Sequence, residues 1–449
     1  MFQSLRAGIL DTSIRFLILT RDSGLVGARG WPDRSSLGAW FFQGILEQAM
    51  LAVGEGSQIR VRDTMSYSNS IGWVYSRVTD LLGFVSSKEE HKTQWLGLEG
   101  EPVYKDIFLR VLRRPGEVFP KLDLRYFRRN LTGGFVPSSF LFDRLGLPSE
   151  ESEFTTTQKR NLASSVQAAI TELISDLLAS FQKKTGLQQI CLGGGVFHNT
   201  LLVASLERKF GVGNIFVPPA PGNAGCALGE TAWIWHQQMG KPRNPEVRSV
   251  YWGPIFARTE IKDVLDNVKA CYSLHYTGEK TLDSAVQLLR AGKIVGWFHG
   301  ATEFGPRALG NRSILASPWA PYVSENLNDY VKHRESFRPF AVSVREEDCA
   351  RYFEGSPLCR FMNSLAVVRA DADVLPRALQ TSRRPGAPSH RRQGNQPFAV
   401  GIARAFWRTR TGAHSGEHLV QSSRRAPGRS PKGRGSHLFL LRHRCRLHR

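Results

Sequence analysis

Residues 190–217 run in the order strand, glycine-rich turn, helix, strand, and this order constrains the fold more than any other feature of the chain. Ile190 to Leu192 is a short apolar run that leads directly into three consecutive glycines. Leu201 to Phe210 has its apolar residues at helical spacing, and a second apolar run, Ile215 to Val217, follows it. Strands that alternate with helices in this way predict an α/β fold.

Other segments support the same class. Helical spacing is clearest from Thr157 to Phe181, where apolar residues recur at intervals of three and four, and Gly186 is expected to end this helix. Ile71 to Phe84 predicts a shorter helix, and Val53 to Val61 alternates like a strand around a glycine turn. Farther along, a helical segment followed by the apolar run Ile294 to Phe298 predicts a second α/β unit.

The chain divides into regions of different character. A glycine and two prolines lie among charged residues at 240–245, and they indicate a domain boundary. We therefore expect an unassigned N-terminal stretch that matches nothing, two α/β domains and a basic tail. Their limits are residues 1–50, 51–245, 246–373 and 374–449.

The positive charge is concentrated in the tail. Residues 374–449 hold 17 basic residues and one acidic residue, a net charge of +16, whereas the first 373 residues carry only +5. Patterned apolar segments are almost absent from the tail, so we expect it to be disordered and dispensable for the fold. An alternative is a nucleic-acid-binding arm, but its few lysines and few aromatic residues argue against a selected nucleic-acid partner.

Two absences bear on the location of the protein. No uninterrupted apolar run approaches the roughly 18 residues that span a bilayer. The first ten residues lack the basic, apolar and small-residue order of a secretion signal. We therefore expect a cytoplasmic protein with no membrane partner.

Two short segments gather positive charge within the second α/β domain. Their basic residues are Arg307, Arg312, Lys332, Arg334 and Arg338. Gly-Pro-Arg and Arg-Pro-Phe sequences restrict the backbone around these cations, as a site for two polyanionic substrates requires. Arginine suits phosphate oxygens because it donates two parallel hydrogen bonds. The competing interpretation is a solvated basic face with ion pairs to Glu303 and Glu335.

Two glycine-rich turns in the first domain each open a helix. The first carries Gly193, Gly194, Gly195 and Asn199, and the second carries Gly222, Asn223 and Gly225. Backbone N–H groups at such turns can approach a phosphate, and the dipole of the following helix favours an anion. The pair is similar to the phosphate and adenosine loops of sugar-kinase-like folds. Either turn alone is equally typical of a tight strand-to-helix connection.

The most specific motifs lie in residues 294–344, which contain EFGPRALGNRSILA, VKHRE and FRPFAVSV. This run closely resembles the C-terminal region of O-carbamoyltransferases of the NodU/CmcH type. Ser70 to Leu98 is similar to the family motifs S-L-G-x-x-Y-S-x-x-T-x-x-L-G-F and E-x-K-x-M-G-L, with Trp95 in place of the usual Met. The two glycine turns match as well, so the resemblance covers about residues 51–370.

The resemblance implies a two-step carbamoyl transfer. A partial actin/hexokinase-like (ASKHA) domain would precede a partial YrdC-like domain, which would bind ATP and carbamoyl phosphate and form carbamoyl adenylate, with release of pyrophosphate and phosphate. The first domain would then transfer the carbamoyl group to a hydroxyl of a small-molecule acceptor, such as a nodulation factor or an antibiotic. By position, the five cations would hold phosphates and the two glycine turns would cradle the adenylate.

The metal ligands that the resemblance implies are missing. The family holds iron or another divalent metal with an H-x-x-x-H pair before the motif at Ser70, but no histidine precedes His91. Asn223 stands where the family has an Asp ligand, and an amide is a weaker ligand for a hard cation. His198 is the nearest replacement, and a packing or capping role suits it better. We therefore expect no metal site.

The tail also departs from the family, which continues with V-P-I-L-V-N-T-S-F-N-L-R-G-E-P. The protein sequence lacks this segment, yet codons can be chosen for Gly412 to Pro427 that encode it when they are translated from the second nucleotide. Fifteen successive agreements indicate that the end of the chain is out of frame.

Three alternatives to an active small-molecule carbamoyltransferase stay open. The first is an inactive remnant that lacks the metal ligands and the last strands and helices of the family. The second is the nucleic-acid-binding arm. The third is a tRNA-modifying relative that makes a threonylcarbamoyl group, which the EFGPRALGNRS and FRPF motifs disfavour.

Overall fold

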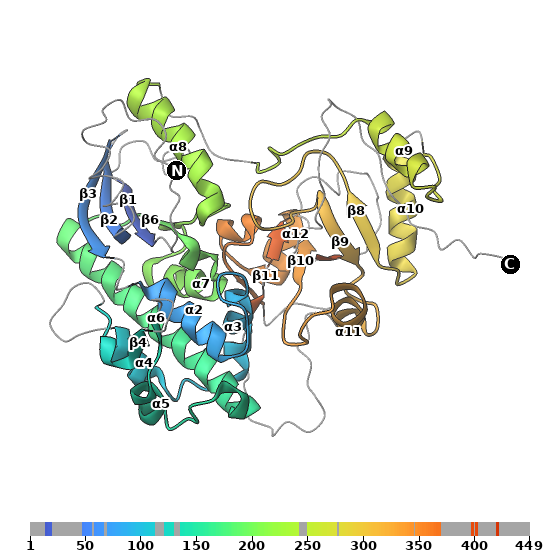
Figure 1. Ribbon diagram of the computed structural model, residues 1–449. Helices are drawn as coiled ribbons and strands as arrows, with labels where there is room; N and C mark the ends of the chain where they lie inside the picture. The colour runs from blue at the N-terminus through green and yellow to red at the C-terminus, as the bar shows by residue number, and fades with distance from the viewer. Residues whose placement is uncertain are drawn as a thin grey trace. The chain divides into compact units, whose positions relative to one another are not determined.

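The chain is described by a computed structural model that divides it into two compact units, Met1–Val247 and Arg248–Arg449 (Figure 1). The residues that it describes are 14–19, 47–55, 58–66, 70–112, 121–129, 135–241, 249–275, 278–344, 346–369, 397–398, 400–402 and 419–421. Each unit combines helices with a sheet, so the predicted α/β class is confirmed at this level.

Unit 1 is built on a five-stranded sheet with the strand order β3-β2-β1-β6-β7. The strands are β1 (Ile14–Leu19), β2 (Glu47–Glu55), β3 (Gln58–Ser66), β6 (Ile190–Gly193) and β7 (Ile215–Phe216). β1, β6 and β7 are parallel, whereas β2 is antiparallel to β1 and to β3. β1 lies in the stretch that sequence patterns do not assign, and it pairs along its whole length with β2. A separate hairpin joins β4 (Phe127–Arg129) to β5 (Phe135–Pro137).

Seven α-helices occur in the described part of unit 1. They are α2 (Ile71–Leu81), α3 (Glu90–Leu96), α4 (Lys105–Leu112), α5 (Ser139–Leu145), α6 (Thr156–Thr185), α7 (Thr200–Phe210) and α8 (Cys226–Trp233). α6 confirms the longest predicted helix. It begins with a capping box formed by Thr155 and Gln158, and it ends at Gly186, whose φ of 67° is left-handed.

α6 is the centre of the unit 1 core. α2, α3, α4 and α7 pack against it (Figure 1), and twelve of its residues are buried. Burial of each large apolar side chain contributes roughly 1.5–3 kcal/mol. Within the described residues, α6 is also the one helix that is long and apolar enough to cross a membrane. Because four helices of the same unit cover it, core packing accounts for that composition.

Two glycines in the LGLEG segment allow a close backbone approach to α6. A Cβ on Gly100 would lie 2.1 Å from the carbonyl oxygen of Arg160, and a Cβ on Gly97 would lie 3.0 Å from that of Ala163. Real Cβ atoms essentially never come within 3.0 Å of backbone atoms, so a side chain at residue 100 would force α6 to shift. The end of the Ser70–Leu98 motif and the two residues after it therefore pack against the backbone of α6.

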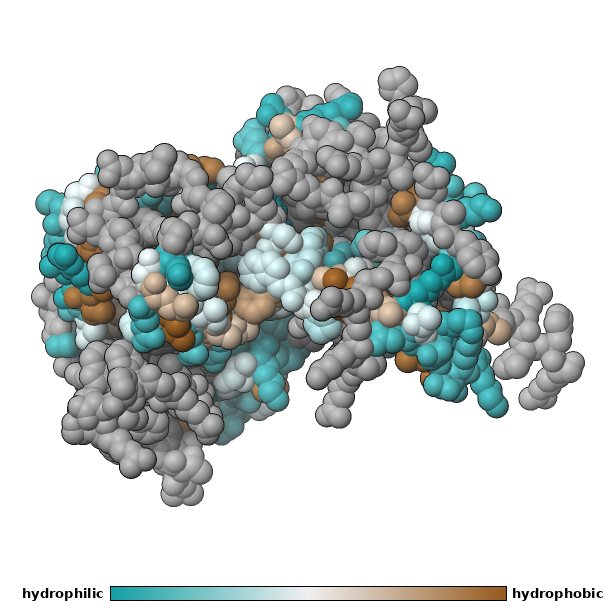
Figure 2. All heavy atoms as spheres, turned by 90° about the horizontal axis from the view of Figure 1, so that it is seen from above, coloured by the Kyte–Doolittle hydropathy of each residue, from teal (hydrophilic) through white to brown (hydrophobic). Residues whose placement is uncertain are grey.

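The end of α8 leaves apolar side chains exposed. α8 continues into a π-helical turn, Ile234–Gln238. Ile234, Trp235 and Met239 are 46%, 43% and 53% exposed. On the face shown in Figure 2, hydrophobic and hydrophilic residues are interspersed. Exposed apolar groups of this kind are common on soluble proteins when they are scattered.

Unit 2 has its own five-stranded sheet, in the order β14-β10-β15-β9-β8. The strands are β8 (Val295–Phe298), β9 (Arg312–Ala316), β10 (Ala341–Val344), β14 (Val400–Ile402) and β15 (Leu419–Gln421). A second sheet joins β11 (Phe353–Glu354), β12 (Ala366–Val368) and β13 (Pro397–Phe398). The described helices are α9 (Arg258–Asn267), α10 (Gly278–Arg290), α11 (Val323–Glu325), a π-helical turn Asn326–Lys332, and α12 (Glu346–Tyr352).

Three strands of unit 2, β13, β14 and β15, come from the basic tail, whose expected disorder stays a prediction. β15 lies between β9 and β10 and is antiparallel to both, and β14 is parallel to β10. Backbone N–H and C=O groups of buried strands need partners, and a three-residue strand can supply them without an apolar pattern that a sequence would reveal. The other tail residues, with most of residues 1–50, lie outside the described part of the chain.

A chain that ends at Asp373 is expected to be less stable than the full chain, because β9 and β10 lose the strand that joins them. Differential scanning calorimetry would show a lower transition temperature for unit 2. A chain that ends at Gly428, which keeps β15, is the control and should unfold like the full chain. Identical transitions for the two truncated chains would contradict a structural role for β15.

Gly100→Ala is expected to lower the free energy of unfolding by about 1–3 kcal/mol, because the added methyl group overpacks the contact with α6. Urea denaturation measures this change. Gly278→Ala is the control, since no atom lies within 4 Å of a Cβ at that position. It should alter stability by less than about 0.5 kcal/mol. A Gly100 variant as stable as the control would rule out the close approach.

Candidate functional site

The structure brings the two predicted glycine turns of unit 1 together. They follow the adjacent parallel strands β6 and β7, and the N–H of Gly194 donates a 2.7 Å hydrogen bond to the carbonyl oxygen of Pro221. Gly194 has a φ of 118°, which residues with a side chain rarely adopt. Helices α7 and α8 begin close behind the turns, at the carboxyl ends of the strands, where open α/β sheets bind ligands.

His198 lies in the contact between the turns. A Cβ on Gly222 would lie 2.5 Å from Nε2 of His198, so the imidazole occupies the space that a side chain at residue 222 would need. Gly222 is buried, whereas the neighbouring Asn223 is exposed. His198 is half-buried and packs against the second turn, in line with the packing role expected for it.

Asn199 is a capping residue at the start of α7. Its side chain is 8% exposed, and its Oδ1 accepts a 3.0 Å hydrogen bond from the N–H of Leu202. The Asn199 amide, which the sequence predicts to bind the adenylate, therefore caps α7. The N–H groups of Gly194 and Gly225 are also used within the turns, since Gly225 donates to the carbonyl oxygen of Gly222 at 2.9 Å.

The residues around the turns fit a metal ion poorly. Asn223 offers a neutral amide, and the imidazole of His198 packs against Gly222. Among the residues that the structure describes, no group of three His, Cys, Asp or Glu side chains could hold a metal ion. We derive no chemical step through a metal.

In unit 2, one buried carboxylate shapes the basic loop between β8 and β9. Glu303 is only 1% exposed. Its Oε1 accepts hydrogen bonds from the backbone N–H groups of Leu309 (2.9 Å), Asn311 (2.7 Å) and Arg312 (3.0 Å). These bonds hold the Gly-Pro-Arg segment in one conformation. Glu303 therefore serves the loop backbone, a role that neither interpretation of the sequence includes.

Arg312 is held within the same loop. Its Nη1 donates to the carbonyl oxygens of His299 (2.7 Å) and Asn311 (2.9 Å), and its Nη2 donates to that of Gly300 (3.1 Å). The guanidinium carbon lies 3.5 Å from the centroid of the Phe298 ring. These contacts give Arg312 a structural role and leave its predicted phosphate contact without support.

Arg334 is also tied to its surroundings. Its Nε donates to Oδ1 of Asn328 at 2.6 Å, and its Nη2 donates to the carbonyl oxygen of Pro339 at 3.3 Å. The guanidinium carbon lies 4.4 Å from the centroid of the Phe340 ring. Arg334 therefore supports the Arg-Pro-Phe segment.

The remaining three cations differ in environment. Arg338 is 5% exposed, and its Nη1 lies 3.9 Å from Oε2 of Glu335, which is the ion pair that the competing interpretation predicts. Lys332 is half-buried at the end of the π-helical turn. Burial lowers the pKa of Arg307, which lies on the loop that Glu303 organises. By solvent exposure Arg307 is half-buried, and its predicted phosphate contact stays a prediction.

Sequence patterns miss the segment that supports this loop. The Tyr251 hydroxyl donates a 2.7 Å hydrogen bond to the carbonyl oxygen of Leu309. The N–H of Phe304 donates to the carbonyl oxygen of Val250 at 2.6 Å. The sequence offers one signal, the aromatic residues and glycine of the Tyr-Trp-Gly-Pro run at 251–254.

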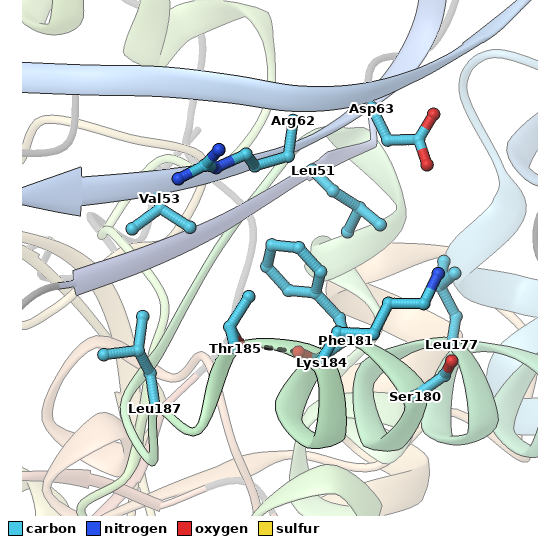
Figure 3. Close-up of a pocket in the computed structure, with 10 residues that line it drawn as sticks. All are labelled: Leu51, Val53, Arg62, Asp63, Leu177, Ser180, Phe181, Lys184, Thr185 and Leu187. Atoms are coloured by element: carbon cyan, nitrogen blue, oxygen red, sulfur yellow. Dashed lines mark hydrogen bonds between the residues drawn. The ribbon is translucent and has the colours of Figure 1, made fainter.

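A cavity of about 600 Å³ lies elsewhere in unit 1 (Figure 3). Leu51, Val53, Arg62, Asp63, Leu177, Ser180, Phe181, Lys184, Thr185 and Leu187 line it. The lining comes from β2, β3, the last turns of α6 and the residues after that helix (Figure 3). None of the predicted site residues contributes, so the cavity and the predicted chemistry do not coincide.

Two family models match the chain. Residues 39–232 match the carbamoyltransferase N-terminus, and residues 286–396 match the carbamoyltransferase C-terminus. The match extends beyond residues 51–370, the range that the motifs cover, and includes part of the stretch expected to match nothing.

Proteins similar to the chain include an uncharacterised protein and nodulation proteins. The uncharacterised protein, from Synechocystis sp., is 34% identical over 326 residues, which are 71% of this chain and 53% of the relative. Nodulation protein NolO of Bradyrhizobium diazoefficiens is 33% identical over 334 residues, 73% of this chain and 58% of the relative. Nodulation protein U of the same organism is 30% identical over 185 residues, 41% of this chain and 30% of the relative. The chain spans about half the length of the curated relatives with the most extensive matches.

Alkaline pH is expected to destabilise unit 2 through Tyr251. Burial and, to a smaller degree, the Glu303 carboxylate raise the pKa of Tyr251 from its usual 10.0 to about 12. A raised pKa gives stability that is complete below pH 10 and is lost as the pH rises to about 12, by an amount on the order of 2 kcal/mol. Urea denaturation from pH 8 to 12 should show this loss in the wild type and a smaller loss in Tyr251→Phe.

Tyr322→Phe is the control for this titration, since Tyr322 is 75% exposed. It should keep the pH dependence of the wild type. Parallel pH profiles for the wild type and Tyr251→Phe would contradict the buried hydrogen bond.

Proposed function

The chain belongs to the carbamoyltransferase family, and on that premise we propose that it transfers a carbamoyl group to a hydroxyl of a small-molecule acceptor. The similarity to nodulation proteins supports an acceptor of the nodulation-factor kind, and an antibiotic or another hydroxyl compound is equally consistent with the family. The observation that carries the proposal is the loop of unit 2 that Glu303 holds, because it contains the EFGPRALGNRS motif and lies inside the C-terminal match.

The two units are proposed to divide the reaction. Unit 1 is the partial ASKHA domain, in which the acceptor hydroxyl attacks the carbamoyl carbon of carbamoyl adenylate, AMP leaves with its phosphate oxygen, and the hydroxyl proton is released. The match to the N-terminal model over residues 39–232 and the five-stranded sheet of unit 1 support this assignment. Unit 2 is the partial YrdC-like domain. The match to the C-terminal model over residues 286–396 supports this part.

ATP and carbamoyl phosphate are the proposed substrates of unit 2. Water cleaves carbamoyl phosphate to carbamate and phosphate, and a carbamate oxygen then attacks the α-phosphorus of ATP, which forms carbamoyl adenylate and displaces pyrophosphate. Arg307 is the residue proposed to contact a phosphate, and Lys332 and Arg338 are secondary candidates. The loop is held by hydrogen bonds before any ligand binds, so its positive charge needs no rearrangement as negative charge develops.

The glycine turns of unit 1 are proposed to hold the adenylate. Gly193, Gly194, Gly195, Gly222 and Gly225 bring the backbone close to the crevice beyond β6 and β7, where the N-terminal ends of α7 and α8 favour an anion. Asn223 is exposed on the second turn and could meet the ligand directly.

An assay with both substrates tests the proposal. The full chain is incubated with ATP, carbamoyl phosphate and a panel of hydroxyl acceptors, and pyrophosphate and carbamoylated product are measured. Pyrophosphate release that requires carbamoyl phosphate is the expected result. No release under these conditions would contradict the function proposed for unit 2, and release without product would place the defect in unit 1.

Arg307→Ala is expected to weaken binding of ATP or carbamoyl phosphate by about 10-fold to 150-fold, since a hydrogen bond from a charged group contributes about 1.5–3 kcal/mol. Isothermal titration calorimetry measures both dissociation constants. Lys293→Ala removes one exposed positive charge from the same unit and is the control, with little expected change. Equal affinities of wild type and Arg307→Ala for both ligands would exclude Arg307 from the site.

A further inference from the structure

Polar side chains from three helices converge on Asn199 and Thr200 at the start of α7. From α6, Gln167 Oε1 accepts from Asn199 Nδ2 at 2.7 Å, and Gln167 Nε2 donates to Asn199 Oδ1 at 3.3 Å. From α2, the Tyr75 hydroxyl donates to the same Gln167 oxygen at 3.0 Å. From α3, Gln94 Nε2 donates to the Thr200 hydroxyl at 2.9 Å.

Four of the five residues in this network are buried, and Gln167 is half-buried. Tyr75, Gln94, Asn199 and Thr200 are between 2% and 8% exposed. Burial and the nearby Glu90 raise the pKa of Tyr75, so its hydroxyl keeps the proton that it donates. Apolar residues of similar volume would hold four helices together at least as well, so cohesion does not require these polar groups. Hydrogen bonds add direction, and a fully paired buried network selects one arrangement of the groups that it joins.

The groups that the network fixes adjoin the first glycine turn. Asn199 and Thr200 directly follow the 3₁₀ turn Gly195–His198. Within this stretch, the N–H of Phe197 donates to the carbonyl oxygen of Gly194 at 3.1 Å, and the N–H of Leu202 donates to Asn199 Oδ1 at 3.0 Å. A change in the position of the Asn199 side chain would therefore be transmitted to Gly194 through the hydrogen-bonded 3₁₀ turn between them.

We propose that Gln167 and Gln94 are positioning residues that hold the first glycine turn in the arrangement that binds a nucleotide phosphate. Neither residue would touch the ligand, since both act through Asn199 and Thr200. The identity of the ligand rests on the proposed function, whereas the effect on the turn does not. The proposal also assigns a role to the Ser70–Leu98 motif, because that segment contains Tyr75 and Gln94 and supports the turn from behind.

Hydrogen exchange tests the effect on the turn without any ligand. Gln167→Leu keeps the approximate volume and removes both amide hydrogen bonds to Asn199. We expect the backbone amides of Gly194, Phe197 and Leu202 to exchange at least ten-fold faster in this variant than in the wild type. Gln182→Leu is the matched control on the same helix, since Gln182 donates one 3.2 Å hydrogen bond to the carbonyl oxygen of Gln188. Unchanged exchange at the three amides in Gln167→Leu would overturn the proposal.

Nucleotide affinity tests the functional half of the proposal. The dissociation constant of the full chain for a non-hydrolysable ATP analogue should rise at least ten-fold in Gln167→Leu, while its transition temperature falls no more than that of Gln182→Leu. Gln167→Glu should recover part of the affinity, because a carboxylate still accepts from Tyr75 and from Asn199 Nδ2. A merely structural residue would lower stability and affinity together and would not be rescued in this way.

Exchange rates and nucleotide affinity distinguish the effect of Gln167 on the turn from its effect on binding. Faster exchange together with wild-type affinity would overturn the positioning role in binding. If the wild-type chain binds no ATP analogue, the proposed function fails at the nucleotide, and the exchange rates of Gln167→Leu alone decide whether the network positions the turn.

Discussion

A backbone N–H or C=O group that is buried without a partner costs about 1–3 kcal/mol, and this penalty governs how both candidate loops are built. In unit 1, the buried Asn199 side chain accepts from the Leu202 N–H in the first turn of α7, four residues after the last of the three glycines. In unit 2, the buried Glu303 carboxylate satisfies three N–H groups of the arginine loop. In each case one polar side chain holds a loop that carries the predicted chemistry, so the loop geometry is determined before a ligand arrives.

Hydrogen bonds to backbone carbonyl groups also separate the cations of unit 2 by role. Arg312 and Arg334 donate to backbone carbonyls and lie against phenylalanine rings, and Arg338 lies beside Glu335. A planar guanidinium with five donors suits such sites because it satisfies several carbonyls at once. The charge cluster is therefore partly a scaffold, and the phosphate contact of Arg307 stays a proposal. A count of the five cations in the sequence therefore overestimates how many of them can contact a substrate.

α6 connects the family motif of residues 70–98 to the glycine turn. Its N-terminal half allows the close approach of Gly97 and Gly100, and its middle carries Gln167 between Tyr75 and Asn199. α6 thus has two roles: the glycines let the neighbouring backbone approach it closely, and its Gln167 side chain orients Asn199 by hydrogen bonds. Residues 70–98 thus contact the helix that holds the first glycine turn, although the turn lies on other elements.

Local patterns by themselves determined the α/β class, the length and ends of α6, and the two glycine turns, because helical periodicity, capping residues and glycine runs act over a few neighbouring residues. They could not reveal the placement of β1 and β15, the Tyr251 support or the Gln167 pair with Asn199. Those features depend on pairing between residues far apart in the chain, and a three-residue strand or a single glutamine carries no pattern of its own. Which arginines hold the fold and which can meet a phosphate was likewise decided by the tertiary structure, because the carbonyls and rings that engage Arg312 and Arg334 are brought to them only when the loops close.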